Sequence, residues 1–449
     1  MGLNFQAYAK QSVPRYTSYP TAPQFSPMIG AEHYEDWLKA LDPDEPLSLY
    51  LHVPYCRELC WYCGCNMKLA SKNAPITEYA DTLIEEVRLV ASHMPGRMKV
   101  SHLHWGGGTP TALEPRDLAR VMEEVRTHYD FLPDAELAIE SDPRTLRSDM
   151  IDCIGELGFT RASFGVQEFD VNVQNAINRF QPPLMVERAV EGLRRVGVSR
   201  INFDLIYGLP LQTVAMIERT IEHCARMAPD RIALFGYAHV PWVAKRQSLI
   251  NEKDLPNAEE RVVQAARAAE LIRAAGYEQI GMDHFARPDD PLAKAARDGT
   301  MRRNFQGYTT DSAAALIGMG TTSIGQTPLG YVQNIPETRA WARAVKAGRL
   351  PVAKGCPITR EDAVRGEIIE AIMCQGRVDP VEVSVAHGFS TGWLANVEVP
   401  LSDMEADGLI ERDGTLIALR EEARHLVRIV ASVFDAYRDQ SKVQYSVAV

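Results

Sequence analysis

Short apolar runs alternate with longer amphipathic stretches between about residues 47 and 240. The short runs are predicted to be strands, because apolar segments of this length between turn residues are typical of buried strands. They lie at 47–53, 100–105, 136–141, 160–165, 200–208 and 231–237. In the stretches between them, apolar residues recur every three or four positions, as on an amphipathic helix. Six β–α repeats predict a parallel sheet covered by helices, either open or closed into a partial (β/α)6 barrel.

Glycine, proline and polar residues follow each predicted strand. The segments at these ends are PYCRELCWYCGC, GGGTPT, ESDPR, GVQEFD, YGLP and YAHVP. Each of them alone is compatible with an ordinary turn. In parallel α/β folds, however, the C-terminal ends of the strands meet at one edge, where ligands bind. Together the six segments predict one convergent site.

The pattern changes after the last predicted strand. Two polar stretches with aromatic residues, GMDHFARPDD (281–290) and RRNFQGYTT (302–310), read as neither amphipathic helix nor strand. From about residue 356 helical patterns dominate, and GLIERDGTLIAL follows them as a hairpin with Asp413-Gly414 as the two-residue turn. We expect a mainly helical, winged-helix-like domain there.

These patterns suggest three parts for the chain: an N-terminal extension over 1–46, a barrel domain with extensions over 47–355, and the helical domain over 356–449. Winged-helix folds often bind DNA, but the last part has 9 Lys and Arg against 16 Asp and Glu. Such an acidic surface repels nucleic acid, so we expect no nucleic-acid partner.

Composition indicates an ordinary globular protein of 449 residues, with 46% hydrophobic residues and a formal net charge of −11. No apolar run approaches the roughly 20 residues that a membrane-spanning helix needs. The N-terminus lacks the basic start and apolar core of a signal peptide. We therefore expect a cytoplasmic protein without stable membrane insertion that acts on small molecules.

Four of the eight cysteines lie within ten residues, at Cys56, Cys60, Cys63 and Cys65. Structural zinc sites usually use two separated cysteine pairs, and no second pair follows. A redox pair needs only two of the four. Three thiolates from one loop can hold three irons of a cubane and leave the fourth iron open. The spacing C-x3-C-x2-C thus favours a [4Fe–4S] cluster, with a structural zinc protein as an alternative.

This cysteine pattern, with Tyr62 before the third cysteine, resembles that of the radical S-adenosylmethionine enzymes, whose open iron binds the methionine part of the cofactor. Other stretches resemble the family of oxygen-independent coproporphyrinogen III oxidases: PRYTSYPT, YCGCN, HWGGGTPT, GVQEFD, NFDLIYGLP, GMDHFARPDD and NFQGYTT. The likeness runs from about residue 12 into the C-terminal region and implies a radical SAM barrel with an N-terminal lid.

The family resemblance also implies a reaction. Two propionate side chains of coproporphyrinogen III would become vinyl groups, giving protoporphyrinogen IX in anaerobic haem biosynthesis. A 5′-deoxyadenosyl radical would take hydrogen from the propionate β-carbon, after which carbon dioxide and one electron leave. The partners implied are the substrate and an electron donor and acceptor that the sequence does not identify. We expect a monomer.

Candidate site residues follow from the resemblance. The cluster ligands would be Cys56, Cys60 and Cys63, and Tyr50 and Glu140 would serve catalysis. Contacts to S-adenosylmethionine, of which the family binds two molecules, would come from residues at strand ends: Tyr50, Tyr62, Gly107, Gly108, Thr109, Glu140, Gln167, Arg179, Asp204, Ala238 and Ile324. The second molecule would contact Gln167, Arg179 and Asp204. For Ala238 and Ile324 the residues alone predict only core packing.

A substrate with four carboxylates requires cationic and amide donors. The candidates are polar residues of the family-like stretches: Arg15, Arg302, Arg303, Asn304 and Gln306. Two further alternatives stay open, a haem-binding chaperone-like paralogue and a radical methyltransferase or tetrapyrrole-cleaving relative. The stretches PRYTSYPT and NFQGYTT and the extra Cys65 favour the oxidase.

Overall fold

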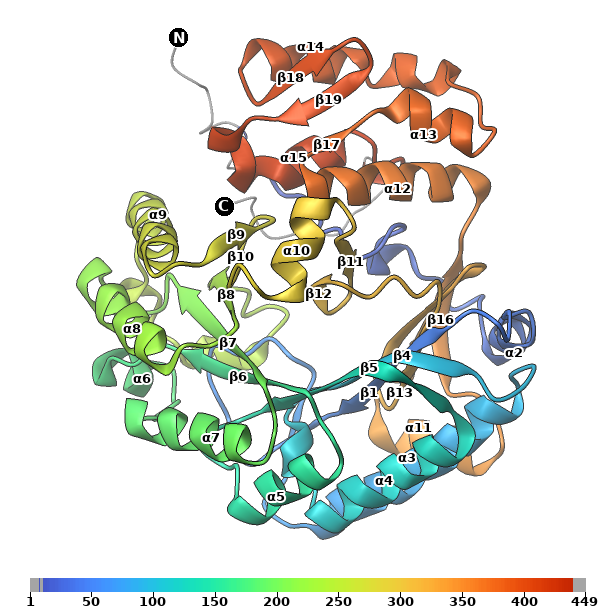
Figure 1. The fold of residues 1–449 in the computed structure, drawn as a ribbon, viewed down its shortest axis with the longest axis vertical. Coiled ribbons are helices and arrows are strands. Elements are labelled where there is room, and N and C mark those ends of the chain that lie inside the picture. The colour runs from blue at the N-terminus through green and yellow to red at the C-terminus, as the bar shows by residue number, and fades with distance from the viewer. Residues whose placement is uncertain (1–7, 9–10, 439–449) are drawn as a thin grey trace. The chain divides into compact units, whose positions relative to one another are not determined.

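The computed structural model describes residue 8 and residues 11–438 (Figure 1). They fall into two compact units. The larger comprises Ser26–Gly276 and Ala313–Gly355, and the smaller comprises Met1–Phe25, Tyr277–Ser312 and Cys356–Val449. The division of the chain at residues 46 and 355 stays a prediction.

Six parallel strands form the centre of the larger unit and confirm the β–α repeats. In spatial order they are β1 (Leu47–Val53), β4 (Lys99–Gly107), β5 (Asp130–Ser141), β6 (Arg161–Gln167), β7 (Arg200–Tyr207) and β8 (Arg231–Gly236). Figure 1 shows helices along the outer side of this curved sheet: α3 (Ala74–Ser92), α4 (Pro115–His128), α5 (Ser148–Glu156), α7 (Pro183–Arg195) and α8 (Val214–Met227). This is the predicted partial barrel.

The core lies between these two layers. Leu49, Leu51 and Val53 of β1 are fully buried and, as alternate residues of a strand, share one face of it. Helix α4 buries Leu118, Val121, Met122 and Val125, which recur every three or four residues and so share one face. The apolar periodicity of the sequence therefore fixes which side of each helix meets the sheet.

The sequence did not predict the short strands that extend the sheet beyond β1. Strand β13 (Leu316–Met319) pairs with β1 in parallel. Strands β14 (Ile324–Thr327) and β15 (Gly330–Asn334) follow as antiparallel neighbours, and β16 (Val352–Pro357) is outermost. These strands are only four to six residues long and rich in glycine or polar residues, so they carry little hydrophobic pattern.

Additional helices complete the larger unit: α2 (Ala31–Lys39), α6 (Val171–Ala176), α9 (Ala258–Ala274) and α11 (Thr338–Lys346). Among the residues that the structure describes, no helix is long and apolar enough to cross a membrane.

The smaller unit contains the helical C-terminal region that the sequence predicts. Its helices are α12 (Arg360–Gln375), α13 (Pro380–Ala386), α14 (Glu398–Ala406) and α15 (Val427–Ser432). A three-stranded sheet accompanies them, in the order β17 (Arg377–Val378), β19 (Leu416–Leu419) and β18 (Ile410–Asp413). The insertion from 277 to 312 adds β9 (Glu278–Ile280), β10 (His284–Ala286), α10 (Pro291–Asp298), β11 (Arg302–Asn304) and β12 (Gly307–Thr309).

The predicted hairpin near residue 413 is present, with its turn shifted by one residue. Asp413 pairs with Leu416 in the ladder, so the two loop residues are Gly414 and Thr415 rather than Asp413 and Gly414. Gly414 has a φ of +59°, which glycine adopts at little cost. The strand thus continues one residue further than the turn signal indicates.

Candidate active site

The four clustered cysteines lie on a loop that follows β1 and precedes α3. Two short parallel strands, β2 (Tyr55–Cys56) and β3 (Lys68–Leu69), close this loop at its base. The amide of Ala70 also donates to the carbonyl of Cys56 at 3.0 Å. The loop therefore leaves the C-terminal end of β1, at the edge where the sequence placed the site, with both ends fixed by backbone hydrogen bonds.

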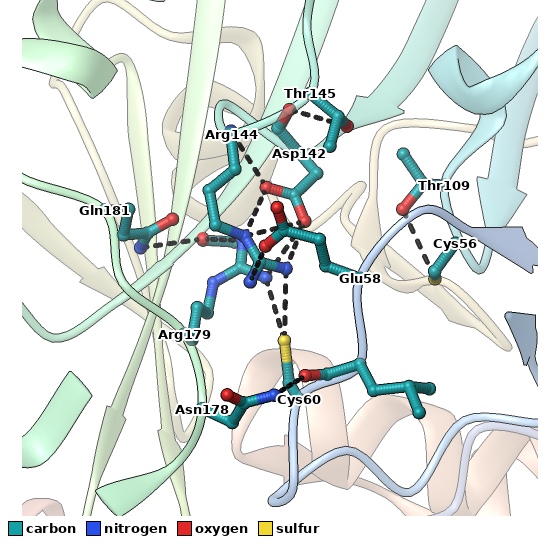
Figure 2. Close-up of polar contacts among 12 residues, drawn as sticks. Cys56, Glu58, Cys60, Thr109, Asp142, Arg144, Thr145, Asn178, Arg179 and Gln181 are labelled. Atoms are coloured by element: carbon teal, nitrogen blue, oxygen red, sulfur yellow. Dashed lines mark hydrogen bonds and ion pairs between the residues drawn. The ribbon is translucent and has the colours of Figure 1, made fainter. Parts of the chain in front are cut away.

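Each of the three candidate ligand sulfurs accepts a hydrogen bond. Thr109 Oγ1 donates to Cys56 Sγ at 3.4 Å, and the backbone amide of Cys65 donates to Cys63 Sγ at 3.4 Å. Cys60 Sγ accepts from the guanidiniums of Arg144 and Arg179 (Figure 2). Donors of this kind stabilise a thiolate and tune the potential of a cluster bound to it.

The fourth thiol, Cys65, is paired with Cys63. The hydrogen bond to Cys63 and burial raise the pKa of Cys65, whereas the hydrogen bonds from Cys65 lower the pKa of Cys63 to about 6. In this pair Cys63 is the anion and Cys65 the donor. Cys65 therefore supports the Cys63 sulfur, in keeping with three ligands and one neighbour.

The residues present fit a [4Fe–4S] cluster. All four loop cysteines are free thiols, and three of them have a hydrogen-bond donor at the sulfur. Over the described part of the chain, no group of three or more His, Cys, Asp or Glu side chains is gathered tightly enough for a single metal ion. A cubane has no such requirement, since each thiolate binds a different iron.

The glycine-rich end of β4 packs directly against the cysteine loop. A Cβ atom at Gly107, where φ is +116°, would lie 2.6 Å from the His52 ring, and one at Gly108 would lie 2.8 Å from the Tyr55 carbonyl oxygen. Close packing inside the protein thus explains both glycines. It also places Thr109, the residue after them, beside Cys56.

Glu140, near the end of β5, is anchored to the same glycine strand. Its Oε2 accepts from the Gly107 amide at 3.0 Å, and its Oε1 lies 3.1 Å from His104 Nε2. About 41% of the Glu140 side chain is exposed, which leaves carboxylate surface for a ligand. The carboxylate is therefore held in place from two sides while one side remains open.

Tyr50 belongs to a buried hydrogen-bonded chain. Its hydroxyl lies 3.0 Å from His52 Nδ1, and His52 Nε2 lies 3.2 Å from Thr322 Oγ1. Burial lowers the pKa of His52 to about 4 and raises the pKa of Tyr50. Both rings are therefore neutral at pH 7. Because both nitrogens of His52 have partners, the structure places this histidine in the packing between strands.

The candidate contacts for a second cofactor lie on neighbouring strands. Asp204 on β7 is in register with Gly165 on β6, whose carbonyl accepts from Arg179 Nη2 at 2.5 Å. Gln167 has a φ of +65°, and its Oε1, like the Nε of Arg179, is buried without a hydrogen-bond partner. Unpaired buried polar atoms are costly, so these two residues suit a polar ligand.

Of the remaining candidate cofactor contacts, Tyr62 and Ala238 are joined by one glutamine, and Ile324 lies near β1. The side-chain amide of Gln247 donates to the carbonyls of Tyr62 (2.7 Å) and Ala238 (3.2 Å), and so joins the cysteine loop to the segment after β8. Ile324 begins β14, and its carbonyl lies close to Gly318, which pairs with Tyr50. Sequence reasoning missed the bridging role of Gln247, because nothing in the pattern distinguishes this glutamine.

Sequence reasoning also missed Asp142 and Arg144, although both lie in the quoted strand-end segment ESDPR. Asp142 Oδ2 contacts Arg144 at 2.6 Å and Arg179 at 3.2 Å, and all three side chains are about nine-tenths buried or more (Figure 2). The two arginines lower the pKa of the Asp142 carboxyl. Their position at the end of a predicted strand was the one feature of the sequence that could have indicated a role at the site.

The candidate substrate-binding residues belong to the smaller unit. Arg302 pairs with Glu370 at 3.2 Å, and Arg303 Nη2 donates to the Arg15 carbonyl at 3.3 Å. Asn304 Oδ1 accepts from the Gln306 amide at 2.9 Å, as in a turn between β11 and β12. Arg15 and Arg303 are thus neighbours, although 288 residues separate them in the sequence.

The radical SAM superfamily model matches residues 50–224. An oxygen-independent coproporphyrinogen III oxidase of Bradyrhizobium diazoefficiens is 46% identical over 99% of this chain and 98% of its own length. One from Cereibacter sphaeroides is 43% identical over 97% and 96%.

A solved structure has the same fold over nearly the whole chain. It is the Escherichia coli coproporphyrinogen III oxidase, described as a radical SAM enzyme, with a TM-score of 0.90 and 36% identity over 95% of this chain and 100% of that one. With identity of this level over almost the full length, the chain belongs to the oxygen-independent coproporphyrinogen III oxidase family of radical S-adenosylmethionine enzymes.

Proposed function

We propose that this chain catalyses the oxidative decarboxylation of coproporphyrinogen III to protoporphyrinogen IX. The observation that carries the proposal is the 46% identity to a named oxidase over 99% of the chain, cysteine loop included. Each of two propionates loses one hydrogen atom from its β-carbon, one electron and one molecule of carbon dioxide, and becomes a vinyl group. The electrons pass to an acceptor that the chain does not identify.

The cluster and S-adenosylmethionine, when bound, supply a radical able to take the β-hydrogen. Cys56, Cys60 and Cys63 would hold the cluster. Glu140, fixed by the Gly107 amide and His104, would accept a hydrogen bond from the cofactor and orient it. The protein's contribution is thus mainly to position the cofactor and to exclude water from the radical.

A second S-adenosylmethionine would occupy the wall formed by Gln167, Arg179 and Asp204. The unpaired buried atoms of the first two support this assignment, because a ligand amino or carboxylate group would satisfy them. The Nη1 and Nη2 atoms of Arg179 already donate to Cys60, Asp142 and Gly165, so the ligand would accept from its Nε.

For the substrate, we propose that Arg15 and Arg303 contact propionate carboxylates. The Nε and Nη1 atoms of Arg303 are buried without a hydrogen-bond partner, and its guanidinium lies over the Tyr308 ring at 4.4 Å. A cation held on an aromatic ring with two spare donors suits an anionic group. We also propose that the extension over residues 1–46 closes over the bound substrate.

An anaerobic product assay tests the proposed function. Full-length protein is reconstituted with iron and sulfide, then given coproporphyrinogen III, S-adenosylmethionine and a reductant. The expected result is protoporphyrinogen IX together with 5′-deoxyadenosine, both identified by mass spectrometry. Loss of product in Cys60→Ser, with product retained in Cys356→Ser, would link turnover to the loop.

The same assay separates the alternatives. Tight binding of haem without any decarboxylation, by protein with an intact cluster, would point to a haem-binding paralogue and refute the proposal. A product that gains a methyl group would indicate a methyltransferase. Zinc without acid-labile sulfide in the isolated protein would exclude the radical reaction altogether.

A further inference from the structure

Arg144 joins a candidate ligand sulfur to two carboxylates at the cysteine loop. It lies on the segment between β5 and α5, and only 4% of its side chain is exposed. Its Nη2 donates to Cys60 Sγ at 3.2 Å, its Nη1 pairs with Glu58 at 2.7 Å, and its Nε and Nη2 pair with Asp142 (Figure 2). The guanidinium is thus fixed on three sides.

These contacts hold the cysteine loop as well as the arginine. Glu58 lies between Cys56 and Cys60 in sequence, so the Arg144–Glu58 pair restrains the C-x3-C turn itself. From the other side, Asn178 Nδ2 donates to the Leu59 carbonyl at 2.7 Å. The turn that carries Cys60 is therefore held by two separate segments, the one after β5 and the one between α6 and α7.

The three ligand sulfurs consequently differ in electrostatic environment. Cys56 accepts from the Thr109 hydroxyl, and Cys63 accepts from the thiol and the backbone amide of Cys65; neither sulfur accepts a hydrogen bond from an arginine in the contacts described above. Cys60 accepts from two guanidiniums, those of Arg144 and Arg179, which share Asp142 as a counter-ion. Positive charge next to one sulfur favours the reduced cluster, which carries one more negative charge.

We propose that Arg144 is a positioning residue that raises the reduction potential of the cluster and protects the Cys60–iron bond. Arg144 acts through the Cys60 sulfur and through the turn between Cys56 and Cys60. This inference rests on the cluster of the proposed function, but it does not depend on the identity of the substrate.

The test is a redox titration of the reconstituted full-length protein, followed by electron paramagnetic resonance without S-adenosylmethionine or tetrapyrrole. In Arg144→Gln the ratio of reduced to oxidised cluster at a fixed potential is expected to fall at least fivefold, about 40 mV for a one-electron couple. Arg147→Gln is the matched control, because Arg147 lies three residues away and its half-exposed side chain pairs with Glu114 and Asp149.

Arg144→Lys is the second variant. Lysine keeps the charge, but a single ammonium cannot contact Cys60, Asp142 and Glu58 together, so a smaller fall in the same direction is expected. If Arg144→Gln does not retain a cluster, Arg144→Lys decides the question. A ratio that falls less than fivefold in Arg144→Gln, or is unchanged or raised in Arg144→Lys, would overturn the proposal.

Cluster retention gives a readout that is independent of the potential. Iron release to a chelator should be several-fold faster in Arg144→Gln than in the unsubstituted protein and unchanged in Arg147→Gln. Equal rates in all three would refute the protective role. Since no tetrapyrrole enters either measurement, failure here leaves the proposed function standing, and failure of the product assay leaves this inference standing.

Discussion

Cys60 differs from the other two candidate ligands because two guanidiniums donate hydrogen bonds to its sulfur, and Cys65 differs from Cys63 in the direction of its pKa shift. Arg144 and Arg179 contact Cys60 Sγ, whereas Cys65 donates its backbone amide to Cys63 Sγ. A backbone donor survives side-chain substitution. Three cysteines of the loop would therefore be needed for their thiolates, as cluster ligands. Cys65 would be needed for the hydrogen bond from its backbone amide.

The first prediction concerns the four thiols. Cys56→Ser, Cys60→Ser and Cys63→Ser should each lose the cluster, because a hydroxyl does not replace a thiolate as an iron ligand. Cys65→Ser should retain most of it, since its amide still reaches Cys63 Sγ. Iron and acid-labile sulfide per chain after anaerobic reconstitution give the measurement. Cys356→Ser is the control, and complete cluster loss in Cys65→Ser would contradict the three-ligand account.

At the scale of residues, the sequence pattern was enough to predict the cysteine loop, because the spacing of ligands along one loop is a local property. The Asp142–Arg144 pair was not predicted. Its role depends on a contact between residues 60 and 144, 84 positions apart, which no local pattern records. The same holds for Gln247, which reaches Tyr62 across 185 positions.

The β4 strand end is the element that brings the glycines, Thr109 and the cysteine loop together. Gly107 has a positive φ and lies against His52 of β1, and Gly108 lies against Tyr55 at the base of the loop. The end of β4 packs this closely only because these positions lack side chains. The glycine-rich segment was predicted to approach a ligand. In the structure this segment packs against the protein's own residues and places Thr109 beside Cys56, and its contact with a ligand stays a prediction.

The second prediction is that Gly107→Ala destabilises the larger unit by about 2–4 kcal/mol, the sum of a positive-φ penalty and overpacking. Gly158→Ala is the matched control. Gly158 has a φ of +73° with nothing within 4 Å of its missing Cβ, so only the backbone term of about 1 kcal/mol applies. Urea unfolding measures both variants, and equal losses would show that contact with His52 is unimportant.

At the scale of elements, hydrophobic periodicity predicted the six parallel strands and the helices between them. Buried parallel strands are nearly continuous apolar runs, which makes them easy to recognise. It did not predict β13, β14 and β15, whose short polar or glycine-containing sequences are stabilised by pairing beside β1 rather than by their own pattern.

Glu86 joins distant parts of the larger unit. Although it lies on α3, its carboxylate accepts from the Gly320 amide, Asn334 Nδ2 and Trp341 Nε1 at 2.7, 2.6 and 3.0 Å. Burial nevertheless raises the pKa of Glu86 from 4.5 to about 7. From the sequence alone, Glu86 would be expected on a solvent-exposed face of the helix, because charged side chains are normally exposed.

The third prediction follows from that shift. The folded protein holds the Glu86 proton more tightly than the unfolded chain, so this stabilisation is fully present below pH 4.5 and is lost as the pH rises through 7. Relative to Glu86→Gln, the free energy of unfolding should fall by about 3 kcal/mol over this window. Urea titrations at several pH values provide the measurement. Glu85→Gln, on the exposed face of α3, is the control, and a pH-independent difference would contradict the assignment.

At the scale of the whole molecule, the sequence was enough to predict the acidic charge balance, the barrel and the cysteine loop. It did not predict that residues 277–312 belong to the same compact unit as residues 356–438, because the contacts that join them form only in the folded chain. Tyr308 illustrates this, since its hydroxyl donates to the Met373 carbonyl at 3.0 Å.

The central claim is that this chain removes two carboxyl groups from one tetrapyrrole. The most direct test counts carbon dioxide released from coproporphyrinogen III labelled with ¹³C in its propionate carboxyls, under anaerobic turnover by the reconstituted full-length protein. Two equivalents of labelled carbon dioxide per substrate consumed are predicted, with Cys63→Ser releasing none. Consumption of S-adenosylmethionine without release of label, by protein whose cluster is intact, would contradict the account.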